Sequence, residues 1–110
     1  MKEDRVYLEH IIEAIEKVVA YSAPGWEEFQ RNPMAQDAVI RNLEIIGEAT
    51  KRLAEDTKTR SPEIPWREVA GLRDVLIHNY MGVNLRRVWN VIQQNIPGLR
   101  KAVEDLLRDA

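Results

Sequence analysis

The stretch Pro33–Glu55 reads PMAQDAVIRNLEIIGEATKRLAE and carries the clearest structural signal in the chain. Its apolar residues recur at the spacing of one helix face, with a second set beside them: Val39, Leu43, Ile46 and Leu53, then Ala38, Ile45 and Ala49. Asn32 suits the capping position before a helix, and Pro33 suits its first turn. We expect a helix over Pro33–Glu55. Its wide apolar arc favours contact on two sides, with the core and either a partner chain or the short segment Trp26–Arg31.

Helical periodicity also dominates the rest of the chain, and strand-like alternation is scarce. In the first helix the apolar stripe is expected to comprise Val6, Ile11, Ile15, Val18 and Val19. The expected elements are helices over Glu3–Ala20, Trp26–Arg31 and Trp66–Tyr80, a polar loop over Asp56–Pro65, a helix starting near Asn84, and a last helix from Leu99 after a break at Pro97-Gly98. We therefore expect an all-α fold. It would be an up-and-down helical bundle of four to five helices in a single domain over residues 1–110, forming a symmetric dimer.

Composition limits the classes of site that the chain can contain. It has 110 residues and no cysteine, which excludes disulfides and thiolate metal sites. No apolar run approaches the roughly 20 residues needed to cross a membrane. The first residues are mixed in charge and lack the apolar region of a signal peptide. We expect a cytoplasmic protein without a membrane segment, a bound metal or a cofactor.

Charge is distributed unevenly along the chain, although the formal net charge is only −2. No acidic residue occurs between Asp74 and Glu104. The basic residues in this window are His78, Arg86, Arg87, Arg100 and Lys101. The window predicts either a local positive surface or a chance cluster on a solvated helix face.

Three polar residues interrupt the segment GLRDVLIHNYMG, Gly71–Gly82. On an ideal helix, Arg73 lies among the apolar positions, Tyr80 points in nearly the same direction, and His78 points roughly 140° away. An inward arginine requires a carboxylate or a phosphate as its partner. The candidate partners are Glu44, Glu48, Asp74 of a partner subunit and a bound phosphate.

Each of these three residues has an ordinary structural interpretation: Arg73 forms an ion pair, His78 lies on the surface and Tyr80 is half-buried. Taken together, the three residues also have a catalytic interpretation. Histidine can exchange a proton near neutral pH, and arginine can stabilise charge on a phosphate. His78 could take a proton from a ribose 2′-hydroxyl or give one to the leaving oxygen, while Arg73 stabilises the phosphorus centre. Because one histidine cannot easily make both transfers, a symmetric dimer would supply the second copy.

The arrangement Arg73, four residues, His78, one residue, Tyr80 resembles the signature of the HepT-like branch of the HEPN superfamily. The segments Asn42–Leu53, Ile64–Val83 and Val88–Leu99 resemble that branch in the same order. The resemblance implies an all-α dimer and a metal-independent endoribonuclease. It also implies the toxin half of a toxin–antitoxin pair. The partner would be a nucleotidyltransferase antitoxin that transfers AMP to the motif tyrosine.

Carried over by residue, the resemblance makes Arg73 and His78 catalytic, Asp74 an orienting residue and Tyr80 the adenylylated position. Arg86 and Arg87, in the acid-free window, are the candidates for contact with an RNA substrate, with tRNA as one possible class. Two alternatives stay open. One is a non-catalytic subunit that positions substrate for a nucleotidyltransferase; the other is a structural dimer whose polar residues form an ion-pair network.

Overall fold

The computed structural model describes residues 2–72 and 84–109, and within them it contains helices and no strands. The helices are α1 (Lys2–Ser22), α2 (Trp26–Arg31), α3 (Pro33–Lys51), α4 (Glu55–Thr59), α5 (Trp66–Ala70), α7 (Leu85–Gln94) and α8 (Ile96–Asp109). The predicted all-α bundle is confirmed, with seven helices in the described residues where four to five were expected. Dimerisation stays a prediction.

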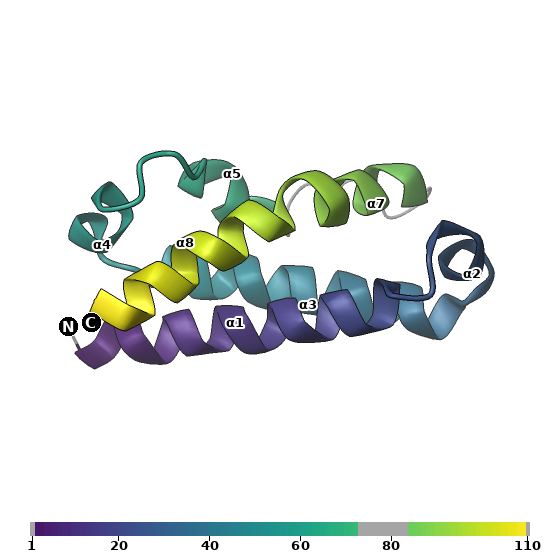
Figure 1. The fold of residues 1–110 in the computed structure, drawn as a ribbon, viewed down its shortest axis with the longest axis horizontal. Helices are drawn as coiled ribbons and strands as arrows, with labels where there is room; N and C mark the ends of the chain where they lie inside the picture. The colour runs from purple at the N-terminus through teal and green to yellow at the C-terminus, as the bar shows by residue number, and fades with distance from the viewer. Residues whose placement is uncertain (1, 73–83, 110) are drawn as a thin grey trace.

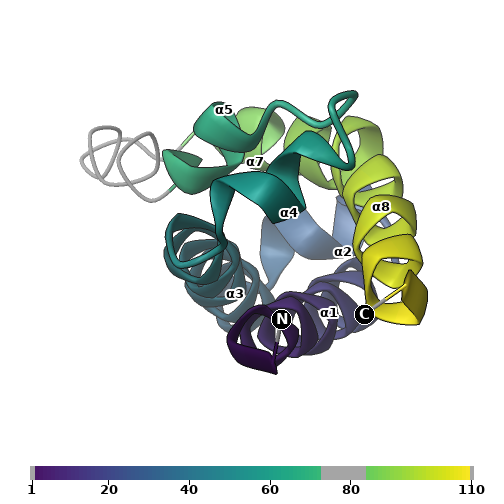
Figure 2. The same cartoon turned by 90° about the vertical axis from the view of Figure 1, so that its left-hand side faces the viewer.

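The long helices run side by side along the longest dimension of the molecule, 41 Å (Figure 1). Helix α1 lies antiparallel to both α3 and α8, and the two termini lie at the same end. Viewed from that end, α3 and α8 flank α1, while α5 and α7 lie across the opposite side (Figure 2). Helix α4 covers the end with the termini, and α2 covers the far end.

The core lies where α1, α3 and α8 meet. Its fully buried aliphatic residues are Leu8, Ile11, Ile15 and Val18 from α1, Val39, Leu43 and Ile46 from α3, and Val103 and Leu106 from α8. Burial of each such side chain stabilises the fold by about 1.5–3 kcal/mol. The apolar stripe predicted for α3 is confirmed. On α1 the prediction is wrong at Val6 and Val19, which are 49% and 40% exposed, whereas Leu8 is buried.

Helix α3 is shorter than predicted, and the predicted polar loop after it contains a helix. Helix α3 ends at Lys51 instead of Glu55, and α4 follows over Glu55–Thr59. Leu53, between the two helices, is buried although it is no longer helical. A helix of five residues spans too few turns to produce a periodic pattern, so sequence periodicity could not reveal it.

Asp4 connects the start of α1 to the start of α4. Its carboxylate is 7% exposed and accepts hydrogen bonds from the backbone N–H of Ala54, at 3.2 Å, and from the Thr57 hydroxyl. Ala54 is the capping residue of α4, so the carboxylate also lies near the positive end of that helix. This contact joins residues 53 positions apart in the sequence.

The predicted caps of α3 and α7 are confirmed, but the predicted start of the last helix is wrong. The Asn32 side chain accepts from the N–H of Ala35 at 3.0 Å, and the Asn84 side chain accepts from the N–H of Arg87 at 3.2 Å. Helix α8 begins at Ile96 and includes Pro97 in its first turn. A proline is tolerated there because a first-turn N–H has no partner within the helix.

Aromatic residues hold α2 and α7 together at the far end of the bundle. The rings of Trp26, Phe29 and Trp89 contact one another, with centroids 5.5–6.4 Å apart. Near the other end, the indole N–H of Trp66 donates to the carbonyls of Lys58 and Ser61, each at 3.0 Å. These tryptophans therefore serve packing.

Replacement of Asp4 tests the connection between α1 and α4. We expect Asp4→Ala to lower the free energy of unfolding by about 1–3 kcal/mol, because two donors lose their buried acceptor. The stability of Asp4→Asn should lie between that of Asp4→Ala and that of the wild type, since one acceptor oxygen remains. Urea denaturation followed by circular dichroism measures the difference. Glu3→Ala is the control, because Glu3 is exposed on the same helical turn. Equal stability of the Asp4→Ala and Glu3→Ala variants would contradict the assigned role.

Candidate functional site

The four motif residues predicted to carry the chemistry, Arg73, Asp74, His78 and Tyr80, lie outside the described residues. The roles assigned to them therefore stay predictions. The structure does describe the residues on either side of this segment and the candidate partners on α3 and α7.

Both flanks of the segment are anchored in the core. On the N-terminal side, α5 packs on α3 through the buried Trp66 and Val69, and Leu72 packs against the same core. Leu72 is directly followed in the sequence by Arg73. On the C-terminal side, Asn84 caps α7, whose buried Val88 and Ile92 face the core. The structure thus holds the two ends of the predicted catalytic segment in defined places.

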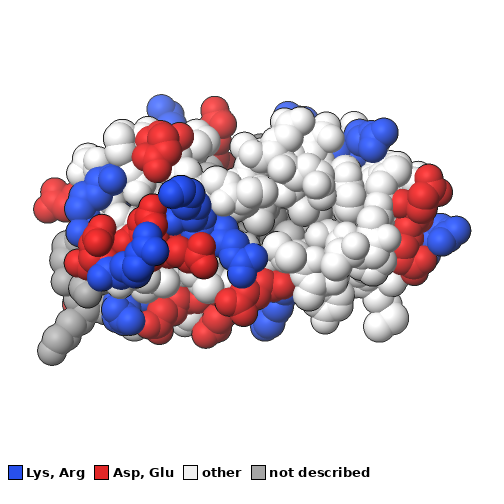
Figure 3. Space-filling model, viewed as in Figure 1, with Lys and Arg blue, Asp and Glu red and all other residues white. Residues whose placement is uncertain are grey.

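The acid-free window of the sequence does not give a uniformly basic surface on α8. Arg100 pairs with Glu104 and Lys101 with Asp105, each at 3.9 Å, because acids one turn further along the helix approach these cations. Figure 3 shows side chains of both signs mixed over the half of the molecule near the termini, and a broad region without charge beyond it. On α8, these ion pairs reduce the local positive surface that was one of the two alternatives for this window.

Arg86 and Arg87 are neighbours in the sequence but have different surroundings. The Arg86 guanidinium lies 4.5 Å from the ring centroid of Trp26, in cation–π contact with it. Arg87 lines a groove between α5 and the α7–α8 junction. Within the described residues, the Arg87 side chain has no ion pair. Of the two candidates for RNA contact, Arg87 is the one that lines this groove.

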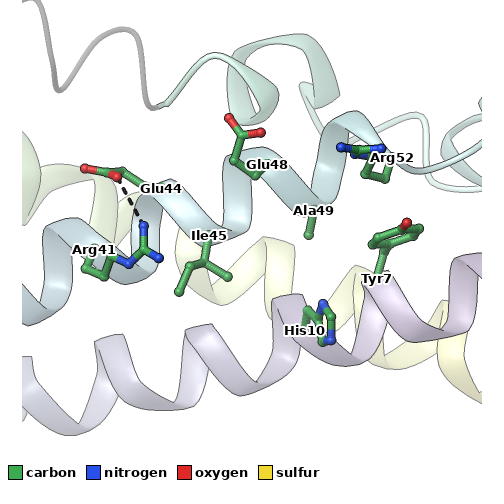
Figure 4. Close-up of a pocket in the computed structure, with 8 residues that line it drawn as sticks. All are labelled: Tyr7, His10, Arg41, Glu44, Ile45, Glu48, Ala49 and Arg52. Carbon is green, nitrogen blue, oxygen red and sulfur yellow. Dashed lines mark ion pairs between the residues drawn. The ribbon is translucent and has the colours of Figure 1, made fainter.

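Glu44 and Glu48 lie one turn apart on α3, and Figure 4 shows both side chains directed away from α1. Glu44 pairs with Arg41 at 3.7 Å, and Glu48 pairs with Lys51 at 3.4 Å. Such partly exposed pairs within one helix contribute only about 0.3–0.5 kcal/mol each, so they do not prevent a stronger partner from binding. Their predicted pairing with Arg73 stays a prediction.

A surface cleft of about 350 Å³ lies beside the contact of α1 with α3 (Figure 4). It is lined by Tyr7 and His10 from α1 and by Arg41, Glu44, Ile45, Glu48, Ala49 and Arg52 from α3 and its end. The structure places His10 on this cleft, where its ring lies edge-to-face with that of Tyr7, with the ring centroids 6.3 Å apart. The spacing of three residues between Tyr7 and His10 was the only signal available. Two arginines and two glutamates give the cleft no clear preference for either sign of ligand.

The described residues contain no group of three histidine, aspartate or glutamate side chains that could hold a metal ion. Among them, no helix is both long and apolar enough to traverse a lipid bilayer.

Comparison with known proteins identifies the family. The model of the family described as "Ribonuclease HepT-like" matches residues 11–106. A "Probable ribonuclease HepT" of Thermococcus cleftensis is 48% identical over 101 residues, which cover 91% of this chain and 92% of the relative. A "Putative RNase" of Caldanaerobacter subterraneus subsp. tengcongensis is 42% identical over 109 residues, covering 98% and 97%.

A further relative, a "Putative RNase" of Methanocaldococcus jannaschii, is 37% identical over 109 residues, covering 98% of this chain and 90% of its own. No solved structure matches the chain. The family match extends over most of the chain, from α1 to α8, and includes the segment that holds Arg73, His78 and Tyr80. By this match and by these identities, the chain belongs to the ribonuclease HepT-like family.

Proposed function

We propose that this protein is a HEPN-type endoribonuclease that cleaves RNA without a metal ion and acts as the toxin of a toxin–antitoxin pair. The observation that carries the proposal is the family match over residues 11–106, which contains the complete Arg73, His78 and Tyr80 motif. The names of the relatives, "Probable ribonuclease HepT" and "Putative RNase", support the same class of reaction.

The motif accounts for the chemistry of RNA cleavage. The 2′-oxygen of a ribose attacks the adjacent phosphorus as His78 removes its proton. Arg73 stabilises the negative charge that develops on the phosphoryl oxygens. The bond to the 5′-oxygen of the next nucleotide then breaks, and that oxygen receives a proton from a second acid. The products are a 2′,3′-cyclic phosphate and a free 5′-hydroxyl, and no metal takes part in any step.

A symmetric dimer supplies the second proton-transfer group. The chain has only two histidines, and His10 lies on α1, whereas His78 lies in the motif segment. With one motif histidine in each subunit, a composite site at the dimer interface contains both a base and an acid. The required partner is therefore a second copy of the same chain.

Glu44 or Glu48 is the proposed partner that orients Arg73, with Asp74 as an additional orienting residue. Two observations support this pairing. Helix α5, which ends shortly before Arg73, packs on α3, and both glutamates extend from α3 away from α1. A carboxylate beside an arginine fixes the guanidinium and lowers the cost of burying its charge.

Tyr80 is the proposed site at which a nucleotidyltransferase antitoxin attaches AMP. The tyrosine oxygen would displace pyrophosphate from ATP and form a phosphodiester to adenosine. The new phosphate is an anion two residues from His78 in the sequence and can occupy Arg73 in place of RNA. The adenine base of the attached AMP is bulky and would lie beside the same catalytic residues. One modification would therefore block both charge stabilisation and access of the substrate.

Substitutions at the motif test the nuclease. We expect purified wild-type protein to cleave RNA in the presence of EDTA and to leave cyclic-phosphate ends, with Arg73→Ala and His78→Ala each at least about 100-fold slower. His10→Ala is the matched control, because it removes the other histidine and should retain wild-type activity. Gel analysis of a labelled RNA panel and mass spectrometry of the cut ends measure the result.

The same variants separate the enzyme from a substrate-positioning subunit. Wild-type protein that binds the nucleotidyltransferase but leaves the RNA panel intact would establish the non-catalytic alternative. Cleavage that EDTA abolishes, or that survives in His78→Ala, would refute the proposed mechanism. Thermal unfolding of each variant confirms that lost activity is not lost folding.

Co-expression with the nucleotidyltransferase tests the modification. We expect the mass of at least one AMP on the peptide that contains Tyr80, and none on the peptides with Tyr7 and Tyr21, which serve as internal controls. Tyr80→Phe should keep its nuclease activity and escape neutralisation. Unmodified Tyr80 in a neutralised complex, measured by peptide mass spectrometry, would show that inhibition works by binding alone.

A further inference from the structure

A groove of about 440 Å³ lies between α5 and the junction of α7 with α8. Its apolar lining includes the buried Val69 and Ile96 and the partly buried Leu72 and Val91. Pockets that bind small organic ligands have this size and this mostly apolar lining, together with a few polar groups that orient the ligand.

Three exposed polar side chains border the groove: Arg87 near the start of α7, Asn95 at its C-terminal cap and Glu68 on α5. Among the described residues, the Arg87 guanidinium and the Asn95 side-chain amide have no hydrogen-bond partner, and Arg87 does not pair with Glu68. These groups are therefore available to a ligand. Arginine suits a phosphate, and an asparagine amide can pair with the donor and acceptor on the edge of a base.

The groove also has a defined place relative to the motif. Leu72 forms part of its wall and is directly followed by Arg73, the residue proposed to contact the reacting phosphate. Consecutive Cα atoms are only about 3.8 Å apart across a trans peptide bond, so Arg73 directly follows a residue of the groove wall along the chain. A nucleotide next to the cleaved bond would therefore be within reach of the groove.

We propose that this groove binds one nucleotide of the RNA adjacent to the cleaved bond, an inference that rests on the proposed nuclease function. The base packs against Leu72, Val91 and Ile96, and Arg87 binds a phosphate. The Asn95 amide contacts the edge of the base. The Glu68 carboxylate accepts a hydrogen bond from an exocyclic amino group of the base. Its negative charge also repels a phosphate, so the phosphate binds at Arg87 and not beside Glu68.

This assignment gives the two adjacent arginines of α7 different roles, in line with their different surroundings. Arg86 is stacked on Trp26 and stabilises the contact between α2 and α7, whereas Arg87 borders the groove. It also provides sequence preference in a protein whose charge alone gives none, because a phosphate contact positions RNA but a contact to a base edge distinguishes bases.

Binding of RNA that cannot be cleaved tests the groove separately from catalysis. The probes are the four homopolymeric trinucleotides with 2′-O-methyl riboses, in which the attacking hydroxyl is blocked. We expect at least one probe to bind wild-type protein. Arg87→Ala and Asn95→Ala should each weaken that binding by about tenfold, the loss expected for one charge-assisted or bidentate contact. Isothermal titration calorimetry measures the affinities.

Two matched controls lie on the same helix. Arg86→Ala removes the neighbouring arginine, and Gln94→Ala removes the amide next to Asn95; neither residue lines the groove. Both variants should bind the probes as the wild type does. Equal weakening of binding by Arg86→Ala and Arg87→Ala would indicate general electrostatic attraction and would overturn the proposed groove site. Probes that bind the wild type and all four variants equally, or that bind none of them, would also overturn it.

A cleavage assay on the same proteins distinguishes the two proposals. Wild-type protein that cleaves RNA, with an unchanged cutting pattern in Arg87→Ala and Asn95→Ala, would refute the groove and leave the nuclease intact. A changed preference among cut sites in Asn95→Ala, but not in Gln94→Ala, would support the groove. The expected binding pattern without any RNA cleavage would support the groove as an RNA site and refute the nuclease.

Discussion

The antiparallel packing of α1 against α3 is the interaction on which the rest of the structure depends. Both helices place their fully buried aliphatic residues along this contact, among them Ile11 and Ile15 on α1 and Leu43 and Ile46 on α3. In the part of the chain that the structure describes, the other helices rest on this pair. Helix α8 lies along α1, α5 and α2 contact α3, and α7 contacts α8. Helix α4 is joined to α1 by the hydrogen bond from Thr57 to Asp4. Loss of this contact would remove the support of both flanks of the motif segment.

The same framework explains how a small helical domain can position an RNA-cleaving site. Helix α5 is short and contributes little stability of its own, because helices of this length are marginal in isolation. Trp66 and Val69 anchor it in the core. The indole N–H of Trp66 donates to the carbonyl of Ser61, which fixes the segment before the helix. The place of Leu72, directly before Arg73, is thus set by packing on α3. The packing therefore fixes the position in the fold from which the motif segment begins.

Local patterns predicted several features correctly. The stripe on α3, the caps Asn32 and Asn84, and the all-α class follow from interactions within about four residues, which sequence periodicity records directly. The same approach failed for α4 and for the start of α8. Helix α4 is too short to show a period, and Pro97 was interpreted as a break although it occupies the first turn of a helix.

Sequence by itself determined the helical class, the apolar stripe of α3, the caps Asn32 and Asn84, and the presence of the Arg73, His78 and Tyr80 motif, because these depend on residue type and near neighbours. Only the tertiary structure decided which distant residues meet. It joined Asp4 to Thr57, placed His10 on the cleft with α3, and separated Arg86, stacked on Trp26, from Arg87, which borders a groove. The physical reason is that periodicity gives the faces of each helix but not its rotation and position against the others, on which every long-range contact depends.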